Sequence, residues 1–226
     1  MNVCTFLEKS VRDYPDNIAV VYRGQRVDYT TLLRLVNRQA GVLSKYRVKK
    51  GDSVILLLDN SIDYVVSYFA ILRVGGVVVA LNTDTTCRDV RYVLDSCQPK
   101  GIITNRGCCQ YLPEGEGAIF KIIVDKKGVI GEEGGEKFSM VEIDEGEDIA
   151  QIIYTSGTTG KPKGIMLTHL NLRSNTESIV EYLRLTSDDK IMVVLPFFYS
   201  YGNSLLLTYI LAGGTLVISH QFVFLN

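Results

Sequence analysis

The sequence predicts an α/β protein with a largely parallel sheet wired as repeated βαβ units and covered by helices. Two observations predict this class. Short continuous apolar runs alternate along the chain with segments whose apolar residues recur at helical spacing. Glycine and proline separate several of these segments, for example Gly75-Gly76 and Pro99. A continuous apolar run fits a strand that is buried on both faces, which is typical of parallel sheets.

In the first part of the chain, expected helices and strands alternate. Apolar residues at helical spacing predict helices at residues 32–43, 62–70 and 90–97. Thr30 and Ser61 precede two of these helices and are the expected caps. Continuous apolar runs predict strands at residues 54–58, 77–81, 102–103 and 122–124.

The second part continues the alternation after a different kind of segment. Residues 125–147 are rich in glycine and charge and lack an apolar period, so they are expected to form an exposed connector. Beyond it, strands are predicted at residues 152–155, 191–195 and 215–218. Helices are predicted from a cap at Thr168 to about Arg184, and over residues 205–211. The expected division is a first α/β subdomain at residues 1–148 and a second, incomplete α/β segment at residues 149–226.

Composition excludes several classes of protein. A chain of 226 residues can bury a substantial core. It carries 24 basic and 25 acidic residues and no basic run, which gives no sign of nucleic-acid binding. No apolar stretch is long enough to predict a membrane span, and the N-terminus does not resemble a signal peptide. A cytoplasmic protein is therefore expected.

The cysteines predict neither disulfides nor a metal site. There are five, at positions 4, 87, 97, 108 and 109, an odd number without Cys-x-x-Cys spacing. With only two histidines in the chain, a zinc site would have to be assembled from scattered residues. Reduced thiols and no protein-held metal are the expectation.

The segment from Thr155 to Gly164, TSGTTGKPKG, carries the strongest chemical signal. Its glycines let backbone N–H groups approach an anion, and hydroxyls with lysines complete an anion-binding concavity suited to a polyphosphate. The order differs from a Walker A loop, because Pro162 follows Gly160-Lys161, and it is not Gly-x-Gly-x-x-Gly. The alternative is a flexible Gly/Ser/Thr linker. Apolar runs on both sides of the segment disfavour that alternative.

This segment resembles the phosphate-binding signature of the AMP-forming adenylating enzymes. That superfamily comprises acyl-CoA synthetases, aryl-CoA ligases, adenylation domains of nonribosomal peptide synthetases and firefly-type luciferases. Residues 27–33 and 69–82 resemble two of its earlier motifs, and residues 195–202, LPFFYSYG, resemble the aromatic motif that follows the phosphate loop. Together the matching segments span most of the chain, so the resemblance implies the N-terminal domain of an adenylate-forming enzyme.

The resemblance also implies a reaction. A carboxylic acid attacks ATP to give an acyl-adenylate, and a thiol of coenzyme A or of a carrier-protein pantetheine arm then displaces AMP. ATP, with Mg²⁺ bridging its phosphates, and the acceptor thiol are the implied small molecules. The implied partners are a small carboxylic acid and, as a further possibility, an acyl carrier protein.

By the same resemblance, the phosphates of ATP would be bound by seven residues of the loop: Thr155, Ser156, Gly157, Thr158, Thr159, Gly160 and Lys163. Thr158 and Thr159 would contact the β- and γ-phosphates. Lys163 would add a positive charge, so Lys163 and Thr158 are the expected catalytic residues.

The aromatic motif implies an acyl-binding segment formed by Phe198, Tyr199, Tyr201 and Gly202. Tyr199 stands where many acyl-CoA synthetases carry histidine and where amino-acid-activating domains often carry aspartate. Tyrosine cannot pair with a substrate ammonium, which disfavours an α-amino acid. Core packing is the alternative role for Phe197 and Phe198, and His169 is expected to be structural.

Members of the superfamily continue beyond the point that corresponds to Asn226. The C-terminal domain, with its catalytic lysine, is expected to be absent, and residues 1–226 alone are expected to show little adenylation. Two alternatives remain open. One is a non-enzymatic remnant that binds a nucleotide or acyl group or acts as an interaction module. The other is an unrelated nucleotide-handling enzyme such as a kinase, which would release ADP.

Overall fold

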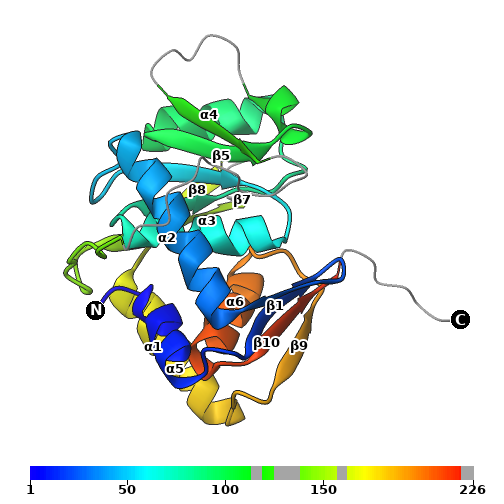
Figure 1. The fold of residues 1–226 in the computed structure, drawn as a ribbon. Coiled ribbons are helices and arrows are strands. Elements are labelled where there is room, and N and C mark those ends of the chain that lie inside the picture. Colours follow the sequence, from blue (N-terminus) through cyan, green and yellow to red (C-terminus); the bar gives the residue numbers. More distant parts are fainter. Residues whose placement is uncertain (113–118, 125–137, 157–161, 220–226) are drawn as a thin grey trace, which may run out of the picture.

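The strands of the protein form two sheets (Figure 1). The structure, a computed structural model, describes residues 1–112, 119–124, 138–156 and 162–219. The strands of the larger sheet are β3 (Ser53–Leu57), β4 (Val77–Ala80), β5 (Gly101–Asn105), β6 (Phe120–Val124), β7 (Ile149–Ser156) and β8 (Pro162–Thr168). Those of the smaller sheet are β1 (Ile18–Tyr22), β2 (Gln25–Asp28), β9 (Lys190–Val193) and β10 (Thr215–Ile218).

Both sheets are mostly parallel. The larger sheet has the order β6-β5-β3-β4-β7-β8, and the smaller sheet has the order β2-β1-β10-β9. Within them only the pairs β1–β2 and β7–β8 are antiparallel among the described residues. The predicted α/β class with a largely parallel arrangement is therefore confirmed.

Helices cover and separate the sheets (Figure 1). They are α1 (Thr5–Asp13), α2 (Tyr29–Lys45), α3 (Ile62–Arg73), α4 (Cys87–Cys97), α5 (His169–Leu183), α6 (Ser200–Ala212) and a short 3₁₀ helix, η1 (Cys108–Tyr111). Helices α2, α3 and α6 lie between the two sheets, while α4 covers the outer face of the larger sheet. Among the described residues, no helix combines the length and the apolar character that crossing a membrane requires.

The continuous apolar strands follow from this layering. In β3, Val54 and Leu56 belong to the core shared with the inner helices, whereas Ile55 and Leu57 pack on the other face with Val90 of α4. Because successive side chains of a strand point to opposite faces, a strand covered on both sides needs apolar residues at every position. The runs seen in the sequence are therefore a direct product of burial on two faces.

Two of the three predicted helix caps are confirmed. The Ser61 hydroxyl accepts a hydrogen bond from the Tyr64 N–H at 3.1 Å, and Thr168 forms a reciprocal capping box with Asn171. The prediction of Thr30 as a cap is wrong. Asp28, in extended backbone just before α2, accepts from the Thr31 N–H at 2.6 Å, so the helix begins one residue before Thr30.

Each sheet draws strands from both parts of the chain. In the smaller sheet β1 pairs with β10, and in the larger sheet β7 pairs with β4 and brings β8 with it. The boundary at residues 148 and 149 therefore stays a prediction about domains. The described end of the expected connector, from Phe138 to Glu147, contains neither helix nor strand. The segment lies against the end of α3, because Arg73 donates two hydrogen bonds to the Phe138 carbonyl at 2.9 and 3.2 Å.

A buried histidine joins the N-terminal segment to α5. His169 is 1% exposed, and its Nδ1 accepts a hydrogen bond from the Val3 N–H at 3.2 Å. Nearby, Glu145 accepts from the N-terminal ammonium of Met1 at 2.8 Å and from Arg173 at 2.9 Å. Burial lowers the pKa of His169 to about 4, so the imidazole is neutral and Nδ1 stays free to accept.

This histidine predicts a loss of stability in mild acid. The folded state binds a proton on His169 only near pH 4, whereas the unfolded chain does so near pH 6.5. As far as His169 is concerned, the free energy of unfolding should therefore be highest above pH 6.5 and decrease as the pH drops towards 4. An asparagine at this position offers an oxygen acceptor without titrating, so His169→Asn should flatten the decline between pH 6.5 and 5. Urea unfolding across this range measures the effect. If the free energy of unfolding decreases equally steeply with falling pH in both proteins, groups other than His169 cause the decline.

Candidate functional site

The carboxyl ends of strands from both sheets meet around a polar cavity of about 320 Å³. Asp59 and Asn60 follow β3, Asn82 to Asp84 follow β4, and Ser219 follows β10. Part of the wall comes from the segment after β9, through Val194, Pro196, Phe198 and Tyr199. In open α/β sheets ligands bind beyond the carboxyl ends of the strands, which makes this cavity the candidate site.

The aromatic motif divides into a core residue and cavity residues. Phe197 is fully buried and its ring lies 5.3 Å from that of Tyr64, so the core-packing alternative is confirmed for Phe197. Phe198 and Tyr199 line the cavity with their ring centroids 4.4 Å apart. Tyr199 is 53% exposed, and Tyr201, at 61%, faces solvent from the first turn of α6. Acyl binding by Phe198, Tyr199 and Tyr201 stays a prediction.

Gly202 is buried beneath the start of the aromatic motif. A Cβ atom added there would lie 2.1 Å from the Pro196 carbonyl oxygen and 3.0 Å from the Phe197 Cα. Glycine is therefore required by the close approach of this segment to α6. The structure thus gives Gly202 a packing role under the cavity wall, and its expected contact with substrate is untested.

The expected phosphate loop connects β7 to β8. Thr155 lies directly opposite Lys163 in this antiparallel pair, so both side chains share one face of the hairpin. Tyr154 points to the other face, where its hydroxyl donates to Ser96 of α4 at 3.1 Å. Thr155 and Lys163 therefore lie on the inner face, the same face as Gln151, whose side chain contacts α6.

The strand register places the hairpin end beside the cavity. Strand β4 pairs with β7 in parallel, with Val79 opposite Ile152 and Ala80 opposite Ile153. Asn82, which lines the cavity, follows Ala80 by two residues, and Thr155 follows Ile153 by two residues, so both lie towards the same end of the sheet. Gly157, Thr158, Thr159 and Gly160 lie outside the described residues, as does the side chain of Ser156, and their expected phosphate contacts stay predictions.

Below the cavity, a buried polar junction ties β7 to two helices. Gln151 Oε1 accepts hydrogen bonds from the Tyr68 hydroxyl of α3 at 3.0 Å and from Asn203 Nδ2 of α6 at 2.9 Å. All three residues are buried, and burial raises the pKa of the Tyr68 hydroxyl, which stays protonated as a donor. These bonds fix the strand that leads to the phosphate loop against α6, the helix that begins within the aromatic motif.

The cavity is also lined by the carboxylates of Asp59 and Asp84, which no sequence motif singled out. The Thr83 hydroxyl donates to Asp59 Oδ1 at 2.7 Å, and Asn82 Oδ1 accepts from the Asp84 N–H at 2.9 Å. A signal was present, because both segments directly follow buried strands. In the part of the chain that the structure describes, no group of three or more His, Cys, Asp or Glu side chains could hold a metal ion.

Comparison with known proteins gives a consistent result. A family model described as AMP-binding enzyme matches residues 7–226. The chain is 32% identical to 2-succinylbenzoate–CoA ligase of Bacillus velezensis, over 92% of this chain and 42% of that protein. It is 26% identical to bacitracin synthase 2 of Bacillus licheniformis, over 97% of this chain and 8% of that protein.

Among solved structures, the inhibitor-bound N-terminal domain of FACL13 from Mycobacterium tuberculosis superposes with a TM-score of 0.87. The sequence identity is 26%, and the match covers 98% of this chain and 58% of that chain. The chain thus spans less than half the length of the curated relatives named above.

The close packing at Gly202 predicts a position-specific effect of alanine. Gly202→Ala should lower the free energy of unfolding by about 1–3 kcal/mol, because the Pro196 carbonyl has to move. Gly41, in the interior of α2, has no heavy atom within 4 Å of an added Cβ. Gly41→Ala is the matched control and should raise stability by about 0.5–1 kcal/mol. Urea unfolding of both variants measures the contrast, and a Gly202→Ala protein as stable as wild type would refute the packing role.

Proposed function

The chain belongs to the family of AMP-binding enzymes, and from this premise we propose that the protein carrying it is an AMP-forming acid–thiol ligase. It joins a carboxylic acid to the α-phosphate of ATP, releases pyrophosphate, and passes the acyl group to a thiol with release of AMP. Support for the class comes from the CoA ligase among its relatives. The whole activity is proposed for the natural protein, since the chain spans only part of those relatives.

One observation carries the proposal. Strand β7 ends, and the antiparallel strand β8 begins, at the same end of the sheet as the cavity lined by Phe198 and Tyr199. An adenylating enzyme must bring a polyphosphate and a carboxylate together, because the first half of its reaction depends on positioning and charge neutralisation. A phosphate-binding segment beside an aromatic-walled cavity supplies both requirements.

Lys163 and Thr155 provide the described part of the proposed phosphate site. A lysine ammonium acts as a point charge beside phosphate oxygens, and each hydrogen bond to a charged oxygen contributes roughly 1.5–3 kcal/mol. Thr158 and Thr159 are proposed to donate to the β- and γ-phosphates, with Gly157, Gly160 and Ser156 offering backbone donors. Mg²⁺ enters with the substrate, as MgATP, and needs few protein ligands.

The cavity is proposed to bind a carboxylic acid whose apolar or aromatic part lies against Phe198 and Tyr199. Tyr201 and Gly202 complete the proposed acyl-binding segment. Tyr199 offers no charge to an ammonium group, but Asp59 and Asp84 line the same cavity. Because these two carboxylates can pair with an ammonium group, the proposal does not exclude an amino acid. It specifies only a carboxylate and a part that fits the aromatic wall. The proposed acceptor is coenzyme A or, as bacitracin synthase 2 among the relatives supports, pantetheine on an acyl carrier protein. The proposed location is the cytoplasm.

The test is ATP–pyrophosphate exchange by the natural protein with acetate, hexanoate, palmitate, benzoate and phenylalanine as probes. Exchange that depends on one of the acids, with AMP as the product once coenzyme A is added, is expected. ATP turnover to ADP would favour a kinase, and ATP binding without exchange for any carboxylic acid would favour a non-enzymatic remnant. Little exchange by residues 1–226 alone stays a prediction.

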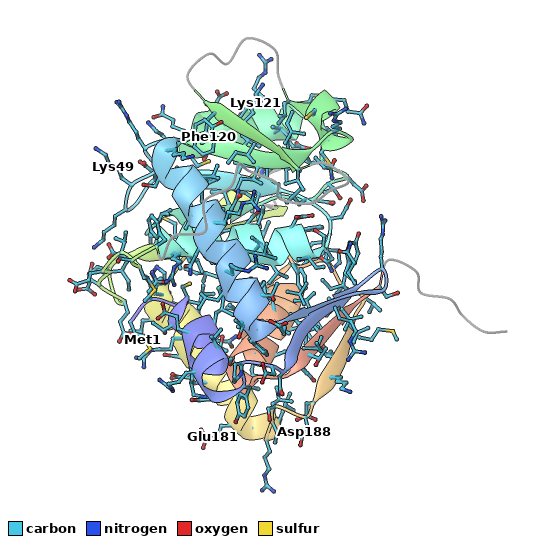
Figure 2. All side chains as sticks on the ribbon, in the orientation of Figure 1. Met1, Lys49, Phe120, Lys121, Glu181 and Asp188 are labelled. Atoms are coloured by element: carbon cyan, nitrogen blue, oxygen red, sulfur yellow. The ribbon has the colours of Figure 1, made fainter. Side chains whose placement is uncertain are left out.

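Lys163 offers a sharp prediction for nucleotide binding. Lys163→Ala should weaken MgATP binding about tenfold or more, because a charge beside the phosphates is lost. Since Lys163 is exposed, the free energy of unfolding should hardly change. Lys121 is also exposed and lies on β6, at the opposite edge of the same sheet (Figure 2), so Lys121→Ala is the matched control. Isothermal titration calorimetry measures both, and equal affinities would remove Lys163 from the site.

A further inference from the structure

A side-chain amide joins the segments that follow β3 and β9, which are strands of different sheets, at the candidate site. Asn60, two residues before α3, donates from Nδ2 to the Leu195 carbonyl at 2.9 Å. Its Oδ1 accepts from the Phe197 N–H at 2.8 Å. Asn60 is 8% exposed, so both bonds are shielded from water.

These two bonds satisfy the backbone on both sides of Pro196. Proline has no N–H, so the segment beyond β9 cannot continue a normal strand ladder through that residue. The neighbouring Leu195 carbonyl and Phe197 N–H are the groups that a ladder would use, and the Asn60 amide offers one donor and one acceptor that match them. Removal of the amide would leave the Phe197 N–H, on a fully buried residue, without this partner.

The wall of the cavity depends on the same backbone. Pro196, Phe198 and Tyr199 line the cavity, and they flank the residue whose N–H Asn60 holds. Phe197 packs against Tyr64 of α3, which begins directly after Asn60 and its neighbour Ser61. The amide and the ring therefore fix one segment of the smaller sheet to one helix under the larger sheet.

We propose that Asn60 is a positioning residue that holds the aromatic wall at residues 196–199 in the orientation that receives the carboxylic acid. It acts through backbone atoms and does not itself contact the reacting groups. The functional part of this inference rests on the proposed ligase activity, whereas the positioning itself is a property of the fold. Loss of the amide should therefore weaken use of the acid and leave use of ATP almost unchanged.

Amide hydrogen exchange of the natural protein tests the positioning directly. Asn60→Ala should accelerate exchange in peptides covering residues 197–201 about tenfold or more, while peptides from β3 and β5 keep the wild-type rate. Asn60→Asp keeps an acceptor for the Phe197 N–H and loses the donor, so it should accelerate exchange less. Asn17→Ala is the matched control, since the Asn17 amide donates to carbonyls of Ser187 and Gly213, outside the cavity lining. Unchanged exchange at residues 197–201, or equal acceleration throughout the protein, would overturn the proposal.

Kinetics test the functional part with a different readout. In pyrophosphate exchange with the best probe acid, Asn60→Ala should raise the KM for that acid about tenfold and change the KM for ATP less than about twofold. An equal rise in both KM values, or no change in either, would reject the functional role. If wild-type protein shows no exchange with any acid, the ligase proposal fails, and hydrogen exchange still decides whether Asn60 positions the segment.

Discussion

Burial of helix α3 between the two sheets is the constraint on which the site depends. Eleven of its twelve residues are buried, and it contacts β1 of the smaller sheet as well as β3 and β4 of the larger one. A helix that is buried on nearly all sides needs cover around its whole circumference, and both sheets contribute to that cover. With the sheets fixed on one helix, the carboxyl ends of β3, β4, β9 and β10 meet at one cavity.

Side-chain hydrogen bonds then set the arrangement around that helix. Tyr68, Gln151 and Asn203 connect α3, β7 and α6 in the interior, and Asn60 fixes the segment that carries the aromatic wall. A buried polar group without a partner is costly, so these bonds select one packing of the apolar layers over others of similar burial. The same set of contacts holds both the strand leading to the phosphate loop and the wall of the cavity.

Much of this fold was predictable because its signals are local. Apolar runs such as residues 54–58 predicted strands, and Ser61 and Thr168 predicted where helices begin. Strand β8 was missed, although residues 165–167 form an apolar run. It is an edge strand whose Ile165 and Met166 are 45% and 64% exposed, unlike the strands buried on both faces that the other apolar runs predicted. Helix α1 and the β1–β2 hairpin were missed as well. Their positions depend on contacts across the chain, such as the pairing of β1 with β10.

The candidate site was predictable only in part. The phosphate-loop sequence and the aromatic motif were identified by resemblance, and Phe198 and Tyr199 do line a cavity. Asn60, Asp59 and Asp84 carry no motif. They follow the neighbouring strands β3 and β4, and the segment after β9 of the other sheet completes the cavity. Attack of the carboxylic acid on the α-phosphate of ATP is the step that defines the proposed function. Incubation of the natural protein with ¹⁸O-labelled carboxylic acid, ATP and coenzyme A, followed by mass spectrometry, tests it directly. One ¹⁸O atom in AMP is the predicted result, and unlabelled AMP or an ADP product would exclude this step.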